Sequence, residues 1–256
     1  MIKPGLVSIT FRQLTPPEIV ALVAQAGLTG IEWGGDVHAP QGDISQAKAV
    51  RQMTAEAGLQ VAAYGSYYRL SHDDSGPFEA VLETAITLGA PAIRVWAGRQ
   101  GTDKADAAYR QAVIEDSRRS ADLAAAAGIT IVYEFHANTL TDSNESTRKL
   151  LAAVDHPNLK TYWQPPRYSK LDYNLAGLAA VFPRLYGLHV FTWHTETGER
   201  LPLADGADLW AQYLAKIATL DRDMFAMIEF VANDSPEQFL LDAEVLKNWL
   251  LPYVAT

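Results

Sequence analysis

Four apolar runs in the second half of the chain each carry, near their ends, a polar residue that could bind a metal ion. The runs are ITIVYEF, LKTYWQ, LYGLHVF and MFAMIEFV, and the polar residues are Glu134, Gln164, His189 and Glu229. Such a run predicts a buried strand, where a carboxylate is costly unless it is paired or binds a cation. Because four of these residues recur with helical stretches between them, they indicate oxygen and nitrogen ligands that converge on one metal ion.

The elements that would position these residues repeat along the chain. An Ala-rich helical stretch, a glycine and an apolar strand follow one another in AQAGLTGIEW, AEAGLQVAAYG, TLGAPAIRVW and AAAGITIVYEF. The glycines are Gly27, Gly58, Gly89 and Gly128, and a glycine just past a helix end adopts the left-handed conformation that other residues resist. Repeated strand–helix units predict a parallel sheet.

Eight such units fit the sequence, which predicts a single-domain (β/α)8 TIM barrel over residues 1–256. A doubly wound sheet is the alternative, but it usually carries a glycine-rich loop after its first strand, and SITFRQLTPPE has no glycine there. Helix-capping signals are expected at Thr15–Glu18, at Thr141 and Asp142, and at Asp234–Glu237. The strands are expected near residues 5–11, 29–33, 60–65, 92–97, 129–135, 159–164, 186–192 and 225–231, and the helices near 16–26, 44–57, 77–88, 105–127, 143–154, 174–182, 207–219 and 235–250.

Composition restricts the class of protein. A hydrophobic content of 48% supports a large core, and the net charge of −9 argues against binding to a nucleic-acid backbone. The chain has no cysteine, which excludes disulfides and thiolate metal sites. The sequence also contains no apolar run of the ~18 residues that a membrane span needs, and its start, MIKPGLVSITF, does not resemble a signal peptide. We therefore expect a cytoplasmic enzyme with no membrane partner.

Several strand-end motifs resemble the xylose isomerase-like TIM barrels, and more narrowly the sugar-phosphate isomerase/epimerase family with its ketose 3-epimerases. The motifs are IEWGGDVH, IRVWAG, VYEFH, YWQP, LHVFTWH and MIEF, and the resemblance covers nearly the whole chain. It implies a Glu, an Asp, a His and a Glu at the ends of strands five to eight that hold a divalent metal ion. Here these positions are Glu134, Gln164, His189 and Glu229.

The chain departs from the family's pattern at three places. Gln164 replaces the usual Asp, which keeps a carbonyl oxygen but removes one negative charge. Arg167 stands where a substrate-contacting His often follows the sixth strand. Thr195 stands where the epimerases tend to carry an Arg beyond the strand-seven His, although Arg200 lies in the same loop. These departures favour a divergent substrate.

Strand parity separates the residues that face the barrel interior from those that face the helices. Glu134 and His136 share one face, so both are expected at the barrel mouth, where active sites of this fold lie. Glu134 and Arg94 could instead form a buried salt bridge, and His189 could be a core histidine. Gln164 could hydrogen-bond a ligand without touching the metal.

Other residues at strand ends are candidates for substrate binding. Trp96 and Trp193 are expected as pocket walls, whereas Trp33 and Trp163 have the parity of core residues. The remaining candidates, each with a structural alternative such as a rim loop or a hydrogen bond between strands, are Glu32, Tyr67, Arg94, His136, Arg167 and Arg200. His194 is a further rim histidine, and Tyr68 and Arg69 lie beside Tyr67.

The resemblance implies chemistry next to a carbonyl group. A divalent cation (Mn²⁺, Mg²⁺, Co²⁺ or Zn²⁺) stabilises an enediolate while Glu134 and Glu229 exchange the proton. The first hypothesis is a metal-dependent sugar isomerase or epimerase acting on a small hydroxy-carbonyl compound. The alternatives are a lyase or dehydratase using the same intermediate, a nuclease, which six histidines and the negative charge disfavour, and a sugar-binding barrel without activity. The resemblance also allows a homo-oligomer.

Overall fold

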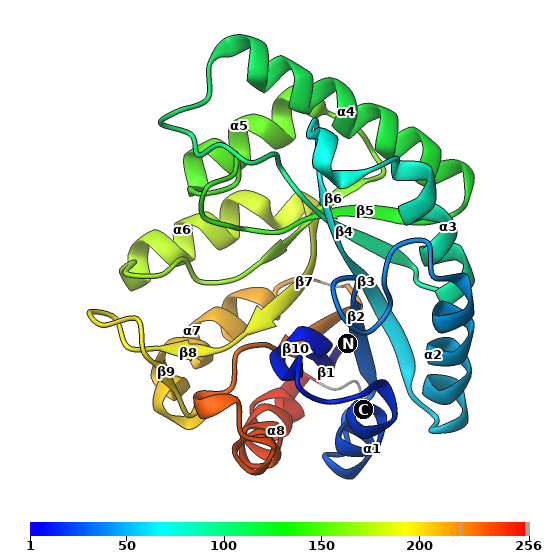
Figure 1. Ribbon diagram of the computed structural model, residues 1–256. Helices are drawn as coiled ribbons and strands as arrows, with labels where there is room; N and C mark the ends of the chain where they lie inside the picture. The colour runs from blue at the N-terminus through cyan, green and yellow to red at the C-terminus, as the bar shows by residue number, and fades with distance from the viewer. Residues whose placement is uncertain (221, 254–256) are drawn as a thin grey trace.

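A computed structural model of the chain, which describes residues 1–220 and 222–253, shows a closed barrel of parallel strands surrounded by helices (Figure 1). The strand order around the barrel is β1-β10-β7-β6-β5-β4-β3-β2. The barrel strands are β1 (Ile2–Val7), β2 (Gly30–Gly34), β3 (Gln60–Arg69), β4 (Ala92–Trp96), β5 (Thr130–Tyr133), β6 (Leu159–Trp163), β7 (Leu185–Val190) and β10 (Met224–Ile228). The expected (β/α)8 barrel is therefore confirmed.

The helices follow the barrel strands in regular alternation. They are α1 (Pro16–Gln25), α2 (Ile44–Glu56), α3 (Phe78–Leu88), α4 (Ala107–Ala126), α5 (Asn144–Val154), α6 (Leu171–Val181), α7 (Ala207–Ile217) and α8 (Pro236–Leu250). Gly27, Gly58, Gly89 and Gly128 all have positive φ angles, between 67° and 73°, just after helices. The left-handed turns expected from the sequence are thus present.

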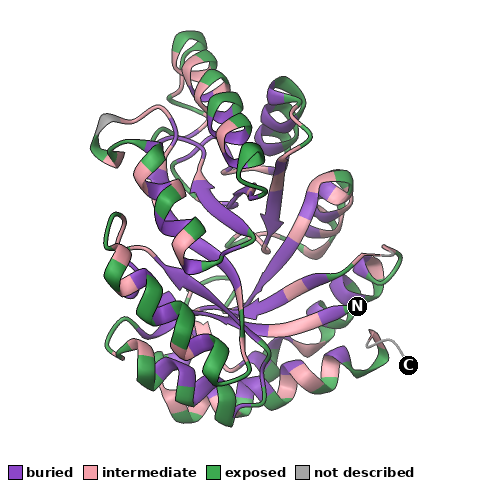
Figure 2. Cartoon of the chain, turned by 90° about the vertical axis from the view of Figure 1, so that its right-hand side faces the viewer, coloured by how far each residue is buried: buried purple, intermediate pink, exposed green. Residues whose placement is uncertain are grey.

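Two layers of apolar packing hold the barrel. The larger lies between the strands and the helices and includes Trp33 and Trp163, and the smaller fills the barrel interior and includes Val132 and Tyr162. Figure 2 shows the same division, with buried strands inside and helices exposed on their outer faces. The parity expected for Trp33 and Trp163 is confirmed.

The beginning of the chain differs from the expected strand at 5–11. β1 ends at Val7, and Ser8–Phe11 form a short 3-10 helix. Ser8 leaves the sheet because its Oγ accepts a hydrogen bond from the amide of Gly34 at 2.8 Å and contacts His38 Nδ1 at 2.9 Å. The following cap is as expected: Thr15 and Glu18 form a capping box at the start of α1.

Three further details correct the sequence analysis. α5 is capped by Ser143, whose side chain accepts from the amide of Ser146, because Thr141 donates to the carbonyl of Glu134 and Asp142 accepts from Thr102 instead. β3 runs through Tyr67 to Arg69, past the strand end expected near residue 65. The sequence also did not predict the small antiparallel pair β8 (Thr192–Trp193) and β9 (Arg200–Leu201).

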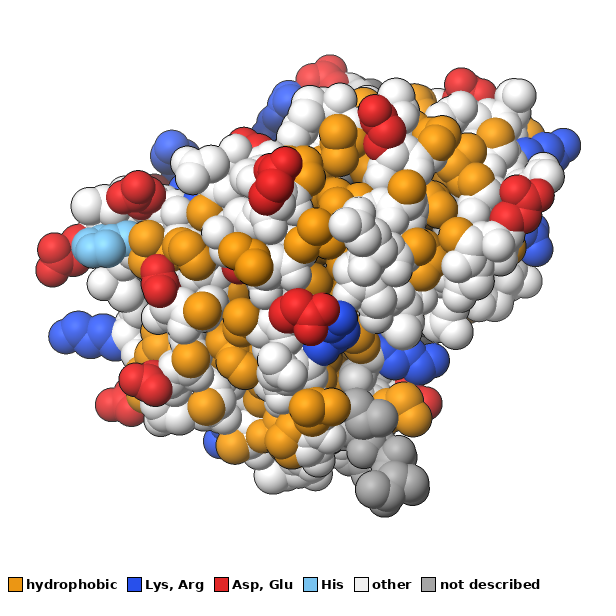
Figure 3. All heavy atoms as spheres, turned by 90° about the horizontal axis from the view of Figure 1, so that it is seen from below, with side chains coloured by type: hydrophobic (Ala, Val, Ile, Leu, Met, Phe, Trp, Pro, Cys, Tyr) orange, Lys and Arg blue, Asp and Glu red, His pale blue; other side chains and the backbone are white. Residues whose placement is uncertain are grey.

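Charged side chains of both signs lie on the surface. On the face drawn in Figure 3, Asp and Glu side chains, together with Lys and Arg, are scattered among hydrophobic and uncharged groups. Within the described residues, no helix has the length and apolarity to cross a membrane.

His38 supplies a pH-dependent part of the stability. It is fully buried, and its Nε2 donates to the carbonyl of Leu14 at 3.1 Å, so Nδ1 is the acceptor for the Ser8 hydroxyl. Burial lowers the pKa of His38 below its usual value of 6.5. The unfolded chain therefore binds the proton first as the pH falls. The contribution of His38 is fully present above about pH 6.5 and declines below it.

We expect His38→Gln to reduce the free energy of unfolding at about pH 7.5 and to reduce it less at about pH 5.5, because the wild type loses stability in acid through this group. Urea unfolding at both pH values measures the difference, with His194→Gln as a control for removing an exposed imidazole. A difference between wild type and His38→Gln that stayed constant with pH would contradict this account.

Candidate active site

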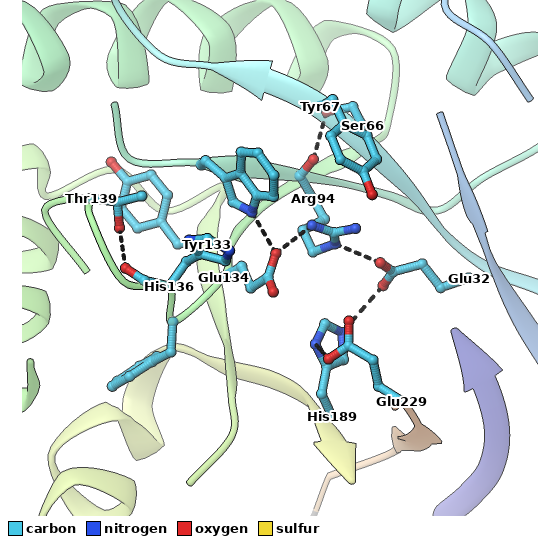
Figure 4. A network of polar contacts seen from close by, with 12 residues as sticks. Glu32, Ser66, Tyr67, Arg94, Tyr133, Glu134, His136, Thr139, His189 and Glu229 are labelled. Atoms are coloured by element: carbon cyan, nitrogen blue, oxygen red, sulfur yellow. Dashed lines mark hydrogen bonds and ion pairs between the residues drawn. The ribbon is translucent and has the colours of Figure 1, made fainter. Parts of the chain in front are cut away.

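Five ionisable side chains meet inside the barrel, toward the carboxyl ends of its strands (Figure 4). Each is at most 3% exposed. They come from β2, β4, β7 and the positions directly after β5 and β10, and they are Glu32, Arg94, Glu134, His189 and Glu229. A parallel barrel brings its strand ends together in this way, so residues distant in sequence form one cluster.

Arg94 links two of the carboxylates. Its Nε donates to Glu32 Oε1 at 2.6 Å, and its Nη1 donates to Glu134 Oε2. Burial alone would lower the pKa of Arg94, but the charges of Glu134 and Glu32 raise it well above its usual range. The sequence analysis left a Glu134–Arg94 salt bridge open as an alternative to metal binding, and the salt bridge is present.

Glu134 is held by a second donor as well. The indole Nε1 of Trp96 donates to the same Oε2 at 2.6 Å. Burial would raise the pKa of Glu134, but the charge of Arg94 above all, with the bond from Trp96, lowers it. Glu134 is therefore held ionised through Oε2, and no hydrogen bond to another described residue occupies its Oε1.

His189 lies between two carboxylates. Its Nδ1 is 3.4 Å from Glu229 Oε2, and its Nε2 is 3.5 Å from Glu32 Oε2. Burial would lower the pKa of His189, but the nearby negative charges of Glu229 and Glu32 raise it to about 10. Without a cation, the imidazole is thus protonated and balances its acidic neighbours.

The donor set fits a divalent cation. Glu134, His189 and Glu229 each offer a ligand atom, and these atoms lie within 4.8 Å of one another. Glu229 Oε2 and His189 Nε2 are buried without a hydrogen-bond partner among the described residues, a costly state that ligation at Glu229 would relieve. With His189 neutral, three carboxylates and one guanidinium leave two negative charges, which a divalent cation would neutralise.

Gln164 directs its amide oxygen into this cluster. Its Nε2 donates to the carbonyl of Phe135 at 2.8 Å, and its Oε1 lies 2.9 Å from His189 Nδ1. The first bond fixes the amide so that its oxygen and not its nitrogen faces His189. Gln164 can therefore offer a neutral oxygen to a cation or orient His189.

A cavity of about 910 Å³ opens beside the cluster. Among its lining residues are Glu134, His136, Gln164, Arg167 and Trp193. His136 stacks on Trp96 with ring centres 4.7 Å apart, and its Nδ1 lies 2.7 Å from the carbonyl of Ala137. That carbonyl accepts a hydrogen bond from Nδ1, which leaves Nε2 available to a ligand.

The other expected site residues lie farther from the cluster. Tyr67 packs edge-on against Trp96 and accepts a hydrogen bond from Arg12. Arg200 forms an ion pair with Asp234 and lies over the ring of Phe230, and it is not among the residues that line the cavity. The imidazole of His194 accepts hydrogen bonds from backbone amides of its own loop. The structure therefore does not bring His194 or Arg200 into the cluster.

The sequence analysis missed two residues that shape the site. A Cβ atom on Gly65 would lie 2.7 Å from both Arg94 Nη2 and Glu32 Oε1, so this glycine makes room for the ion pair. A glycine inside an apolar strand is a recognised signal of such a close approach. Tyr162 packs against the His189 ring at 4.5 Å, and it has the same inward parity as Gln164.

Comparisons with known proteins agree with this fold. The chain is 26% identical to a 3-dehydroshikimate dehydratase of Bacillus anthracis in an alignment of 289 positions that covers 99% of this chain and all of the relative. The crystal structure of the probable 3-DHS dehydratase AsbF from Bacillus anthracis matches with a TM-score of 0.80 and 22% identity, covering 97% of this chain and 99% of that one.

Two further solved structures share the fold. A xylose isomerase-like TIM barrel protein from Mycobacterium smegmatis in complex with magnesium has a TM-score of 0.74 and 16% identity, and covers 99% of this chain and 98% of that one. D-allulose 3-epimerase from Methylomonas sp. has a TM-score of 0.73 and 15% identity, and covers 97% and 98%.

The model of one protein family matches residues 20–249, which is most of the sequence and includes every residue of the cluster. The chain belongs to the xylose isomerase-like TIM barrel family.

Proposed function

We propose that this protein is a metal-dependent lyase that removes water from a small hydroxy-ketone such as 3-dehydroshikimate. The observation that carries the proposal is the buried Glu134–His189–Glu229 group beside a cavity of about 910 Å³. The full-length similarity to a 3-dehydroshikimate dehydratase supports dehydration as the reaction. This proposal gives the lyase, second among the sequence-based hypotheses, preference over the isomerase.

The positions of the Glu134 and Glu229 carboxylates support a reaction that uses a single catalytic base. Glu134 is among the residues that line the cavity, and Glu229 is not. An epimerase needs one group to remove a proton from one face of a carbon and another to return it on the opposite face. A dehydratase needs a base for the proton and an acid for the departing hydroxyl. Glu134 and His136, two residues apart on one cavity wall, suit these two roles.

The reaction would balance as follows. Glu134 takes a proton from the carbon next to the ketone, and the C–H electron pair forms the double bond of an enolate. As the carbonyl re-forms, a new carbon–carbon double bond arises and the carbon–oxygen bond to the neighbouring β-hydroxyl breaks. The departing oxygen receives a proton from Nε2 of the protonated His136 ring and leaves as water, and His136 becomes neutral with its remaining proton on Nδ1.

A divalent cation held by Glu134, His189, Glu229 and the amide oxygen of Gln164 would stabilise the negative charge that develops on the ketone oxygen. Glu32 lies on the Nε2 side of His189 and so favours Nδ1 as the ligand atom, the nitrogen that faces Glu229 and Gln164. Arg94 and Trp96 bind Glu134 through Oε2 only, so that the two lone pairs of Oε1 would serve the cation and the proton.

Epimerisation of a ketose is the second candidate. The observation in its favour is that Glu134 and Glu229 reach one centre from β5 and β10, which are separated in the barrel by β6 and β7. Deuterium incorporation from heavy water into a recovered ketose, with no dehydrated product from 3-dehydroshikimate, would decide for the epimerase.

Glu134→Gln should reduce the turnover of 3-dehydroshikimate at least about a hundredfold, because the amide cannot accept the proton. It should also reduce the amount of divalent metal that copurifies, because one charged ligand is lost. Ultraviolet absorbance of the aromatic product measures the first effect, and elemental analysis the second.

Glu83→Gln is the matched control, since Glu83 is an exposed glutamate on α3. It should keep both metal and activity. If Glu134→Gln retained the metal content and turnover of the wild type, both the metal site and the proposed base would be wrong.

Gln164→Asp should tighten binding of Mn²⁺ or Mg²⁺ by about tenfold or more, because a carboxylate replaces a neutral oxygen that already faces His189. Gln164→Leu should weaken binding. Titration of the metal-free protein by calorimetry measures both. Equal affinity in all three proteins would show that residue 164 lies outside the metal's coordination sphere.

A further inference from the structure

Several arginines lie near the mouth of the barrel, and five of them can be compared by their partners. Arg94 binds Glu32 and Glu134, Arg12 binds Asp36, and Arg200 binds Asp234. Among the described residues, no carboxylate forms a salt bridge with the other two. These two are Arg69 and Arg167.

Arg69 and Arg167 are held in the same way but in different places. Each guanidinium carbon lies 3.9 Å from the centre of an indole, Arg69 over Trp96 and Arg167 over Trp193. Arg69 also donates to the carbonyl of Gly98 at 3.3 Å. Arg167 lines the cavity that Glu134 also lines, and in the described part of the chain it is the cavity's one lysine or arginine.

The backbone before Arg167 is conformationally restricted, which limits where its side chain can lie. Pro165 and Pro166 precede it directly, and each proline restricts the backbone to a narrow range of φ. The Ser169 hydroxyl bonds back to the carbonyl of Pro166. A guanidinium that lies over an indole face can keep N–H groups available, where they match the two oxygens of a carboxylate.

We propose that Arg167 binds the carboxylate of the substrate and thereby selects a hydroxy-ketone acid over a neutral sugar. This inference rests on the proposed function, because it assigns the substrate class of the same site. The cavity wall supplies one arginine, which matches a single negative charge, and it also contains three acidic residues, Asp103, Glu134 and Asp142. Three acids in the wall disfavour the double charge of a phosphate ester.

A binding experiment separates this assignment from the proposed reaction. The ligands are 3,4-dihydroxybenzoate, which forms when 3-dehydroshikimate loses water, and its uncharged methyl ester. Calorimetry on the metal-loaded protein should show that the wild type binds the acid about 10- to 100-fold more tightly than the ester, the effect of one charge-assisted hydrogen-bond pair. Arg167→Gln should weaken binding of the acid by that factor and leave the affinity for the ester unchanged.

Arg69→Gln is the matched control, because it removes an equally stacked arginine outside the cavity, and it should keep the preference for the acid. The assignment is overturned if the wild type shows no preference, if Arg167→Gln weakens acid and ester equally, or if Arg69→Gln alone removes the preference. Tighter Arg167-dependent binding of ribulose 5-phosphate than of the acid would overturn the choice of a carboxylate. A wild type that prefers the acid through Arg167 yet forms no product would refute the dehydratase and keep the carboxylate site.

Discussion

The buried guanidinium of Arg94 is the interaction on which the rest of the site depends. It is 2% exposed inside a barrel of mostly apolar side chains, where an unpaired charge would be very costly. Glu134 compensates it from the end of the adjacent strand β5, and Glu32 compensates it from β2, two strands away on the other side. The absent side chain at Gly65 gives this ion pair its space. Removing one partner would leave a buried charge, so these residues act as a unit.

The same ion pair extends into the metal-ligand candidates. Glu134 contacts Arg94, Arg94 contacts Glu32, Glu32 faces His189, and His189 faces Glu229. The chain of contacts thus joins the two carboxylates that approach the centre from β5 and β10. Because its charges are coupled, the protonation of His189 and the binding of a cation are alternative ways to balance one cluster. This coupling explains why a salt bridge to Arg94 and a role in metal binding are compatible for Glu134.

The sequence predicted the barrel because helix-terminal glycines and apolar strands repeat, and it predicted the facing of Glu134, Trp33 and Trp163 because strand parity is strict. It could not predict that Arg94 donates hydrogen bonds to both Glu32 and Glu134, because these contacts depend on the relative stagger of β2, β4 and β5. It also could not separate Arg200 from Arg167. Both follow strand ends, but Arg200 meets Asp234, a loop residue brought near only by the closed barrel.

Two of the three departures from the family pattern, Gln164 and Arg167, change the charge of the site in the same direction. Gln164 in place of an Asp removes one negative charge, and Arg167 in place of a His adds a permanent positive one. Both residues belong to the segment that follows β6, and both line the cavity. Together they make that part of the wall more positive, while Glu32, Arg94 and Glu134, from β2, β4 and the end of β5, keep their ion pairs. A more positive wall after β6 suits a substrate that carries a negative charge. The two replacements change which substrates the cavity binds, and they leave intact the network that holds Glu134 and His189.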